Sequence, residues 1–402
     1  MVDKRSRYAI CTIISRNYLS YAKILARSVL DHHPEISFYL LVVDTMPERI
    51  KLGPHITVLG LADLSLPHIR DMCFSYNVLE LCTALKPTLL RTLLFRYEYD
   101  SVVYLDPDIL IFRELAQALS KLGKSNLILT PHLLTPIPMD GLRPTEQDIL
   151  LSGIYNLGFI GLKKSKQTKH FIEWWETRLR THCRIEHGNG LFVDQKWIDL
   201  VPCLFSSTKV IRDETYNVAY WNLHARKLEL YQQGFVVNGR PLTFFHFSGF
   251  DPEQPTELSS HQNRLQISGK SALGKLLRYY SKLHIQNGYR RSFNWGYEYA
   301  QLSDGRSIPL ALRRLYLGLS ADLKTAFGDP FYSHKGDCFV TWATTPSRHR
   351  LSPFVQHVYE SNLAVRRMFP NVNGADRSAF MRWLKTSAAK ALGFNQQFMH
   401  SR

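Results

Sequence analysis

The sequence lacks any long hydrophobic run. Its longest apolar stretches, such as residues 8–14 and 38–43, are far shorter than the roughly 20 residues that a membrane helix requires. The charged N-terminal residues 1–7 are not followed by the apolar core of a signal peptide. We therefore expect a cytoplasmic protein that is not exported.

Cysteine is also scarce and shows no pattern. The six cysteines have no close pair and no spacing typical of zinc sites: Cys11, Cys73, Cys82, Cys183, Cys203 and Cys338. This distribution predicts free thiols in a reducing compartment and argues against a structural zinc site. A glycine-rich phosphate loop is missing near Ser15, which argues against folds that bind nucleotides through such a loop.

Acidic residues are few in the C-terminal third. Residues 256–402 contain 21 Lys and Arg against 8 Asp and Glu, a net charge of +13, whereas residues 1–255 carry +3. At 402 residues the chain exceeds the usual size of a single core. We expect an α/β domain at 1–255 and a basic, mainly helical region at 256–402. The charge predicts an acidic partner, which is a membrane lipid, a polyanionic acceptor or nucleic acid.

The most informative motif is an acidic pair at the end of an apolar strand. Asp106 and Asp108 follow the β-branched segment 101–105 and flank Pro107. Residues i and i+2 of an extended chain point to the same side, and proline cannot donate to a sheet ladder. Mg²⁺ or Mn²⁺ prefers such oxygen ligands and often shares them with substrate phosphates. The other interpretation is an ordinary exposed turn, in which Asp and Pro are common.

Short apolar segments alternate with helical patterns in the first part of the chain, which predicts a mostly parallel sheet flanked by helices. The predicted strands are 8–14, 37–43, 101–105, 155–162 and 242–249, and the predicted helices include 18–30, 87–95 and one through 171–179. Charged helical patterns follow at 261–280, 308–327, 354–368 and 378–394. Ligands bind beyond the carboxyl ends of strands in such sheets, so Ser15, Asn17 and Asp106 are expected on one rim.

His246 lies in an aromatic strand that ends at Gly249. A lone histidine among phenylalanines is usually a core residue. An acidic pair that needs further ligands changes this interpretation, because neutral imidazole is a good Mn²⁺ ligand and an Asp/Asp/His set leaves positions for phosphate oxygens.

Several motifs occur together in a fixed order over residues 8–250, and this set resembles the GT-A glycosyltransferases, in particular glycosyltransferase family 8. The motifs are the 8–30 unit, Lys86-Pro87, Tyr104-Leu105-Asp106-Pro107-Asp108, Asn156-Leu157-Gly158, Asp194-Gln195 and His246-Phe247-Ser248-Gly249. The segment from Tyr297 onward is similar to C-terminal extensions of bacterial transferases that build surface polysaccharide. The resemblance implies a GT-A fold, which is Rossmann-like, with a basic helical extension.

The resemblance also implies roles for individual residues. Asp106, Asp108 and His246 would hold Mn²⁺ or Mg²⁺ against the diphosphate of a sugar donor, expected to be UDP-linked. The base, ribose and phosphates would meet Thr12, Ser15, Asn17, Tyr18, Lys86, Asp106 and Gly249. Asn156, Asp194 and Gln195 would surround the anomeric carbon and the hydroxyl of a glycan or lipid-linked acceptor. The family retains anomeric configuration.

One departure from the family concerns the residues after Gly249. Family 8 members usually have a Lys-Pro-Trp element there, whereas this chain reads Phe250-Asp251-Pro252-Glu253. Either Lys86 or a basic residue from the segment that begins with residues 261–264 replaces that lysine, or the resemblance is to a sister family. In an inverting sister family, Asp194 would be the first candidate for the general base.

Two other classes of function fit parts of the sequence. A metal-dependent nucleotidyltransferase or phosphohydrolase would also use an Asp-x-Asp pair at a strand end. A basic protein could bind nucleic acid through 256–402, where aromatic residues lie among the basic ones. We favour the glycosyltransferase, with the basic region on an anionic inner membrane surface, because lipid carriers of surface glycans are assembled there. The sugar, the acceptor, the linkage and the oligomeric state are not encoded in any motif.

Overall fold

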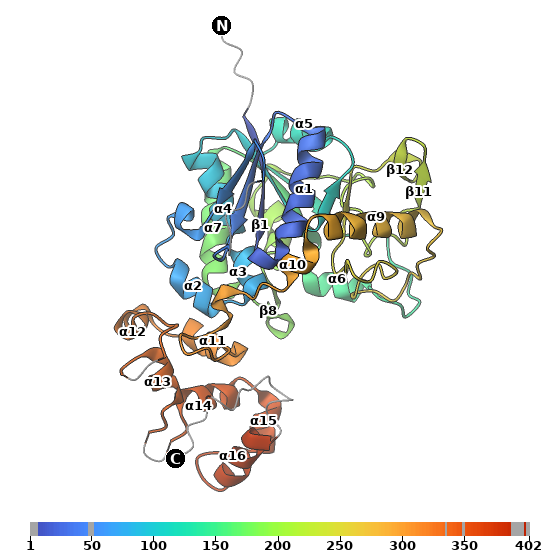
Figure 1. The fold of residues 1–402 in the computed structure, drawn as a ribbon. Helices are drawn as coiled ribbons and strands as arrows, with labels where there is room; N and C mark the ends of the chain where they lie inside the picture. The colour runs from blue at the N-terminus through green and yellow to red at the C-terminus, as the bar shows by residue number, and fades with distance from the viewer. Residues whose placement is uncertain (1–6, 47–51, 334–335, 348–349, 387–397, 399–402) are drawn as a thin grey trace. The chain divides into compact units, whose positions relative to one another are not determined.

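The computed structural model describes residues 7–46, 52–333, 336–347, 350–386 and 398. The chain forms two compact units (Figure 1). The first, here called the sheet unit, comprises Met1–Leu66 and Leu79–Tyr297, and the second, the helical unit, comprises Pro67–Val78 and Glu298–Arg402.

The sheet unit is built on a seven-stranded sheet with the order β10-β6-β7-β4-β1-β2-β3. Its strands are β1 Tyr8–Ile14, β2 Ser37–Val42, β3 Ile56–Leu59, β4 Ser101–Leu105, β6 Leu127–Pro131, β7 Tyr155–Lys163 and β10 Thr208–Val210. Only β7 runs antiparallel to its neighbours β4 and β6, whereas β1, β2, β3 and β4 are parallel. This mostly parallel sheet with flanking helices confirms the predicted fold class.

The helices of the sheet unit bury both faces of the sheet. They are α1 Leu19–His32, α3 Val78–Ala84, α4 Lys86–Arg91, α5 Ala116–Lys124, α6 Glu146–Ser152, α7 Lys166–His182, α8 Val201–Leu204, α9 Ala272–Gln286 and α10 Tyr289–Phe293. The inner stripe of α1, including Leu25 and Val29, packs on Ile10, Ile14 and Val103. These contacts fix β1 beside β4, so that the carboxyl ends of both strands lie at one edge of the sheet.

Smaller strands surround this sheet. They are β5 Ile109–Ile111, β8 Ile185–Glu186, β9 Leu191–Phe192, β11 Leu228–Tyr231, β12 Gly234–Val237, β13 Arg240–Pro241 and β14 Phe244–His246. Strand β14 is much shorter than the predicted strand 242–249, because only residues 244–246 pair with β5. Phe247 and Phe250 leave the ladder and pack in a hydrophobic cluster with Tyr280 of α9.

Residues 256–297 belong to the sheet unit, whereas the sequence predicted a division after residue 255. The Tyr280 ring stacks on Phe247 with 3.7 Å between centroids, so α9 completes the core beside β14. The predicted helix 261–280 begins later, at Ala272. Ser271 caps it, because its hydroxyl accepts from the Gly274 amide at 3.0 Å.

The helical unit confirms the mainly helical character predicted for the C-terminal region. Its helices are α2 Ile69–Ser75, α11 Leu310–Leu317, α12 Ala321–Phe327, α13 Phe339–Thr344, α14 Pro353–Glu360, α15 Leu363–Met368 and α16 Arg377–Thr386. The predicted helices 308–327 and 354–368 are each divided in two, because Ser320 and Asn362 cap new helices. Beyond Thr386, the predicted helix 378–394 lies outside the described residues.

An early segment of the chain is part of the core of the helical unit. Buried Arg313 of α11 donates from Nη1 to the carbonyls of Cys73, Phe74 and Tyr76 at 3.2, 2.7 and 3.0 Å, at the carboxyl end of α2. The Phe74 ring packs edge-on against Tyr316 at 4.9 Å. Among the described helices, none has the length and apolarity needed to cross a bilayer.

Candidate functional site

The acidic pair and His246 come together through the pairing of β5 with β14. In this antiparallel ladder His246 lies opposite Ile109, the residue that directly follows Asp108. The Nε2 atom of His246 is 3.0 Å from Oδ1 of Asp108 and 4.0 Å from Oδ2 of Asp106. One ligand atom from each of the three side chains lies within 4.8 Å of the others. Two carboxylates and one imidazole are donors that fit a divalent cation.

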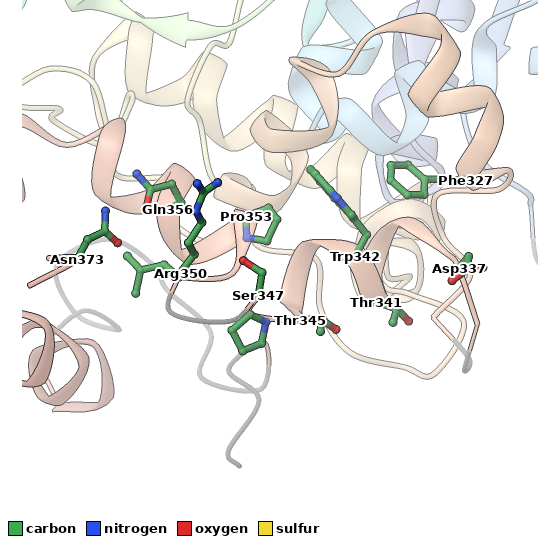
Figure 2. A pocket seen from close by; sticks show the side chains of 12 residues that line it. Phe327, Asp337, Thr341, Trp342, Thr345, Ser347, Arg350, Pro353, Gln356 and Asn373 are labelled. Carbon is green, nitrogen blue, oxygen red and sulfur yellow. The ribbon is translucent and has the colours of Figure 1, made fainter.

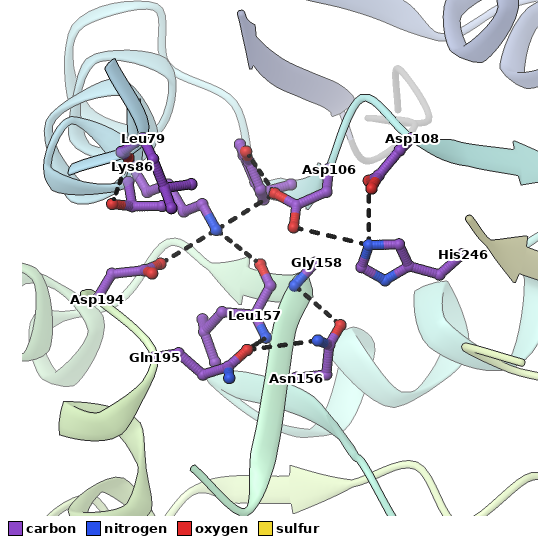
Figure 3. A network of polar contacts seen from close by, with 12 residues as sticks. Leu79, Lys86, Asp106, Asp108, Asn156, Leu157, Gly158, Asp194, Gln195 and His246 are labelled. Carbon is purple, nitrogen blue, oxygen red and sulfur yellow. Dashed lines mark hydrogen bonds and ion pairs between the residues drawn. The ribbon is translucent and has the colours of Figure 1, made fainter. Parts of the chain in front are cut away.

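The protonation of His246 is directed by a chain of amides that starts at the backbone amide of Gly158, whose bond to Asn156 is drawn in Figure 3. The Gly158 amide can only donate, so the atom of Asn156 that it reaches at 3.1 Å is Oδ1. Asn217 Nδ2 therefore donates to that oxygen at 3.0 Å. The Oδ1 of Asn217 then faces Nδ1 of His246 at 3.2 Å and accepts a hydrogen bond from its N–H group. Nε2 is left to face the two carboxylates, which is the arrangement a metal-binding histidine needs.

The carboxylates also control the charge of the imidazole. Burial alone would lower the pKa of His246, but the Asp108 carboxylate beside Nε2 outweighs it and raises the pKa. Burial likewise opposes the ionisation of Asp108, and the imidazole outweighs it, so the pKa of Asp108 is lowered. Asp108 is thus anionic at neutral pH, and Nε2 of His246 can exchange a proton for a cation.

Lys86 is a buried cation shared by three oxygens. Its Nζ donates to the Leu157 carbonyl at 3.0 Å and forms ion pairs with Asp106 at 3.3 Å and Asp194 at 3.1 Å. The Lys86 side chain is only 3% exposed. It begins α4, where Pro87 in the first turn needs no donor. Figure 3 shows Lys86 between the two aspartates.

Asp194 and Gln195 enter the site through an unusual backbone turn. Val193 has a φ of +41°, and such a left-handed conformation is rare for a β-branched residue. After this turn, Gln195 Oε1 accepts from the Leu157 amide at 2.9 Å, and Nε2 donates to the Ser152 carbonyl at 2.9 Å. Asn156 Nδ2 also donates to Gln195 Oε1 at 3.3 Å. Asn156, Asp194 and Gln195 therefore lie together, and their roles around a sugar stay a prediction.

The buried ion pair keeps both partners charged at neutral pH. Burial would lower the pKa of Lys86, but Asp106 and Asp194 outweigh it and raise the pKa. Burial raises the pKa of Asp194 to about 6, and Lys86 opposes that rise. The single positive charge of Lys86 thus stabilises two carboxylates at this end of the sheet.

The residues predicted to contact the nucleotide follow β1. Ser15 donates to Asn17 Oδ1 at 2.5 Å, and the half-exposed Tyr18 ring stacks on Tyr21 at 4.6 Å. Burial and, next, the Asp108 carboxylate raise the pKa of Tyr18 to about 12, so Tyr18 is electrostatically coupled to the acidic pair. Thr12 differs, because it is completely buried within β1. It presents no surface for a ligand in this structure.

Arg264 is the first lysine or arginine after β14, and its side chain is already bound. The guanidinium of Arg264 is bound to Asp140 and to the carbonyls of Leu142 and Pro144. His261 instead lies against Gly249, where a Cβ atom would be 2.6 Å from the imidazole. Gly249 also has a φ of +71°. A residue with a side chain is therefore excluded at Gly249 on two grounds.

Sequence reasoning missed Asn217 and Tyr104 as members of the site. Tyr104 donates its hydroxyl proton to Asp106 Oδ1 at 2.8 Å, and its position two residues before Asp106 on a strand was a usable signal. Asn217 lies in an irregular segment, and no motif marks it. Only a contact between distant parts of the chain brings it to His246.

Gly158 leaves room for the His246 ring. A Cβ atom at this position would overlap Cε1 of His246 and lie 2.8 Å from Nδ1. We expect Gly158→Ala to displace the imidazole, to destabilise the protein by about 1–3 kcal/mol, and to abolish Mn²⁺ binding measured by electron paramagnetic resonance.

Gly161→Ala is the matched control for this change. It lies on the same strand, and its Cβ would be 2.6 Å from Ile128 in the core. We expect a similar loss of thermal stability with Mn²⁺ binding retained. Equal Mn²⁺ affinity of the two variants would contradict the role given to Gly158.

No family model matches the sequence. The chain is similar to two uncharacterised proteins of Bacillus subtilis strain 168. It is 26% identical to YfnF over 256 residues, which cover 60% of this chain and 81% of YfnF. It is 24% identical to YfnD over 251 residues, which cover 61% of this chain and 78% of YfnD.

Solved glycosyltransferase structures are similar in fold. The galactosyltransferase LgtC, in complex with donor and acceptor sugar analogs, matches 69% of this chain and 95% of its own, with 16% identity and a TM-score of 0.42. The glycosyltransferase GlyE of Streptococcus pneumoniae matches 74% of this chain and 66% of its own, with 13% identity and a TM-score of 0.41. At such values these similarities do not identify the chemistry, which has to be inferred from the residues of this chain.

Proposed function

We propose that the protein is a metal-dependent glycosyltransferase that moves a sugar from a nucleoside diphosphate donor, UDP-linked by our expectation, to a saccharide acceptor. The observation that carries this proposal is the Asp106, Asp108 and His246 cluster, whose ligand atoms lie within 4.8 Å of one another. Beside it lies a second polar group, formed by Lys86, Asn156, Asp194 and Gln195. A diphosphate and the sugar attached to it require two such adjoining sites.

Asp106, Asp108 and His246 would hold Mn²⁺ or Mg²⁺. Such a cation stabilises the negative charge that develops on a departing diphosphate, which is worth several kcal/mol. Neighbouring side chains of the protein hold these three ligands in position. Tyr104 orients Asp106 through a hydrogen bond of 2.8 Å, and Asn217 orients His246. This support reduces the reorganisation needed at the moment of reaction.

The nucleoside would lie on the rim that follows β1. Tyr18 offers an exposed aromatic ring, and the partly exposed Asn17 offers an amide that suits a base or a ribose. Ser15 is buried and would act by orienting Asn17, to which its hydroxyl donates. The proposal leaves out Thr12, because its side chain is buried.

Retention of anomeric configuration is part of the proposal. An inverting reaction needs a carboxylate that contacts the acceptor hydroxyl and removes its proton. Asp194 is poorly suited to this task, because its side chain is 2% exposed and paired with Lys86. We assign Asp194 to holding Lys86, and Asn156 and Gln195 to shaping the wall around the sugar.

Donor hydrolysis tests the function directly. The protein is incubated with a panel of nucleotide sugars in Mn²⁺ or in EDTA, next to Asp108→Asn. We expect release of a nucleoside diphosphate from one class of donor, only with the metal, and at least about a hundredfold less in the variant. Release of pyrophosphate or inorganic phosphate instead would indicate a nucleotidyltransferase or phosphohydrolase. No binding of any nucleotide, with or without metal, would overturn the proposal.

Contact with an anionic inner membrane surface remains a proposal that rests on the +13 charge of residues 256–402. It would place a lipid-linked acceptor of surface polysaccharide synthesis near the enzyme. Flotation with phosphatidylglycerol vesicles tests it, since equal recovery with neutral vesicles at physiological salt would refute it.

A further inference from the structure

The helical unit contains a cavity of about 1040 Å³. Its walls come from the end of α12, from α13, from α14 and from the loops around them, and Figure 2 shows the side chains that line it. Such a volume is at the upper end of the range for small-molecule sites. It suits a ligand of several rings better than a single ion.

One side of the cavity is an aromatic platform. The rings of Phe327 and Trp342 lie 5.3 Å apart at an angle of 40°. Fully buried Phe339 supports both, at 6.0 and 6.1 Å. The platform is thus held by the core while Trp342 itself remains partly exposed. An aromatic face of this kind attracts the partly positive C–H groups on the flat side of a sugar ring.

The other side carries planar polar groups. Figure 2 shows Arg350, Gln356 and Asn373 together at one end, and Asp337 lies on the platform side. Within the part of the chain that the structure describes, the side chains of Asp337, Arg350 and Asn373 make no hydrogen bond or ion pair. Amide, carboxylate and guanidinium groups each present two atoms in one plane, which matches pairs of neighbouring hydroxyls.

The charge of the lining argues against a polyanion. Residues 298–402 contain 14 Lys and Arg against 7 Asp and Glu, yet among the described residues the cavity is lined by one arginine and one aspartate. Nucleic acids and polyphosphates bind through many cations. The described lining thus carries no net charge, so the cavity is suited to a neutral, hydroxyl-rich ligand.

We propose that this cavity is a saccharide-binding site that takes an oligosaccharide of several units, with Trp342 as the stacking residue. Binding here does not depend on the proposed transferase reaction. If both exist, the protein holds a saccharide on the helical unit as well as on the sheet unit.

A glycan array tests the proposal on the full-length protein. The array carries neutral and acidic oligosaccharides, and binding is measured in EDTA without a nucleotide sugar, so the result is independent of the sheet unit's site. We expect binding to a defined group of neutral oligosaccharides, weakened about tenfold or more by Trp342→Ala and by Asn373→Ala. Tyr332→Ala is the matched control, because its ring is 47% exposed and does not line the cavity.

Three results would overturn the proposal. The first is the absence of binding to any oligosaccharide at millimolar concentration. The second is unchanged binding in both cavity variants, each shown by circular dichroism to be folded. The third is binding that is restricted to acidic glycans and is lost at about 0.5 M salt, because a basic surface would behave in this way. Because Asn373 is exposed, its replacement keeps the test valid should Trp342→Ala unfold.

Discussion

Replacing Lys86 with methionine is expected to lower the free energy of unfolding by about 3–5 kcal/mol and the rate of donor cleavage by about 10²–10³-fold. Methionine has a similar length but no charge. It leaves Asp194, with a side chain 2% exposed, and Asp106 without their shared cation. Thermal unfolding in EDTA and donor hydrolysis in Mn²⁺ measure the two effects separately.

The loss of stability in Lys86→Met should depend on pH. Burial already raises the pKa of Asp194 to about 6 in the presence of Lys86, and removing the cation raises it further. A carboxyl group whose pKa is higher in the folded than in the unfolded protein destabilises the fold as pH rises through its folded pKa. The difference in melting temperature from the wild type should therefore be small near pH 5 and large near pH 8.

Two further variants separate the buried charge from other causes. Lys86→Met combined with Asp194→Asn should regain most of the stability without regaining activity. Lys196→Met removes a lysine whose ion pair with Asp199 is 26% and 14% exposed, and it should cost about 1 kcal/mol or less. Equal, pH-independent destabilisation by the two lysine changes would contradict the explanation.

Replacing Asn217 with glycine is expected to weaken Mn²⁺ binding by about 10–100-fold. Glycine removes the oxygen that accepts from His246 Nδ1 and tolerates the φ of +52° at this position. Without the acceptor, nothing in the amide chain from Gly158 fixes which nitrogen of His246 carries the proton. Mn²⁺ titration followed by electron paramagnetic resonance measures the affinity directly, without any substrate.

Asn217→Asp distinguishes the acceptor from simple packing. Aspartate keeps an oxygen for His246 Nδ1 and loses the donor to Thr130 and Asn156. It should be less stable than the wild type but bind Mn²⁺ within a fewfold of the wild-type affinity. If the aspartate variant instead binds Mn²⁺ as weakly as the glycine variant, Asn217 acts through packing and the positioning role is wrong.

The sequence allowed the local parts of the site to be predicted. The strand before Asp106 is found where the pattern of β-branched residues indicates it, because a fully buried central strand is uniformly apolar. Helix α1 likewise begins within one residue of its prediction. Both features depend on side chains that are near in sequence.

The parts that were missed depend on distant contacts. Asn217 approaches His246 because the next residue, Val218, bridges to Phe245 of β14, and no periodic pattern encodes that contact. The helix predicted at 261–280 begins eleven residues late, because Ser271 caps it and Tyr280 must reach Phe247. The division into units was missed for the same reason, since α2 joins helices that lie more than two hundred residues further along the chain.

The placement of α2 in the helical unit determines when its apolar face is covered during synthesis. The sheet unit has all its strands once residue 246 has been synthesised, and its last helix follows by residue 293. The apolar face of α2, which includes Phe74, is covered only when Tyr316 and Phe339 have been synthesised. During synthesis the chain therefore carries an exposed hydrophobic segment through the completion of the sheet, a state in which nascent proteins are prone to aggregate. Release at residue 297 would make that exposure permanent.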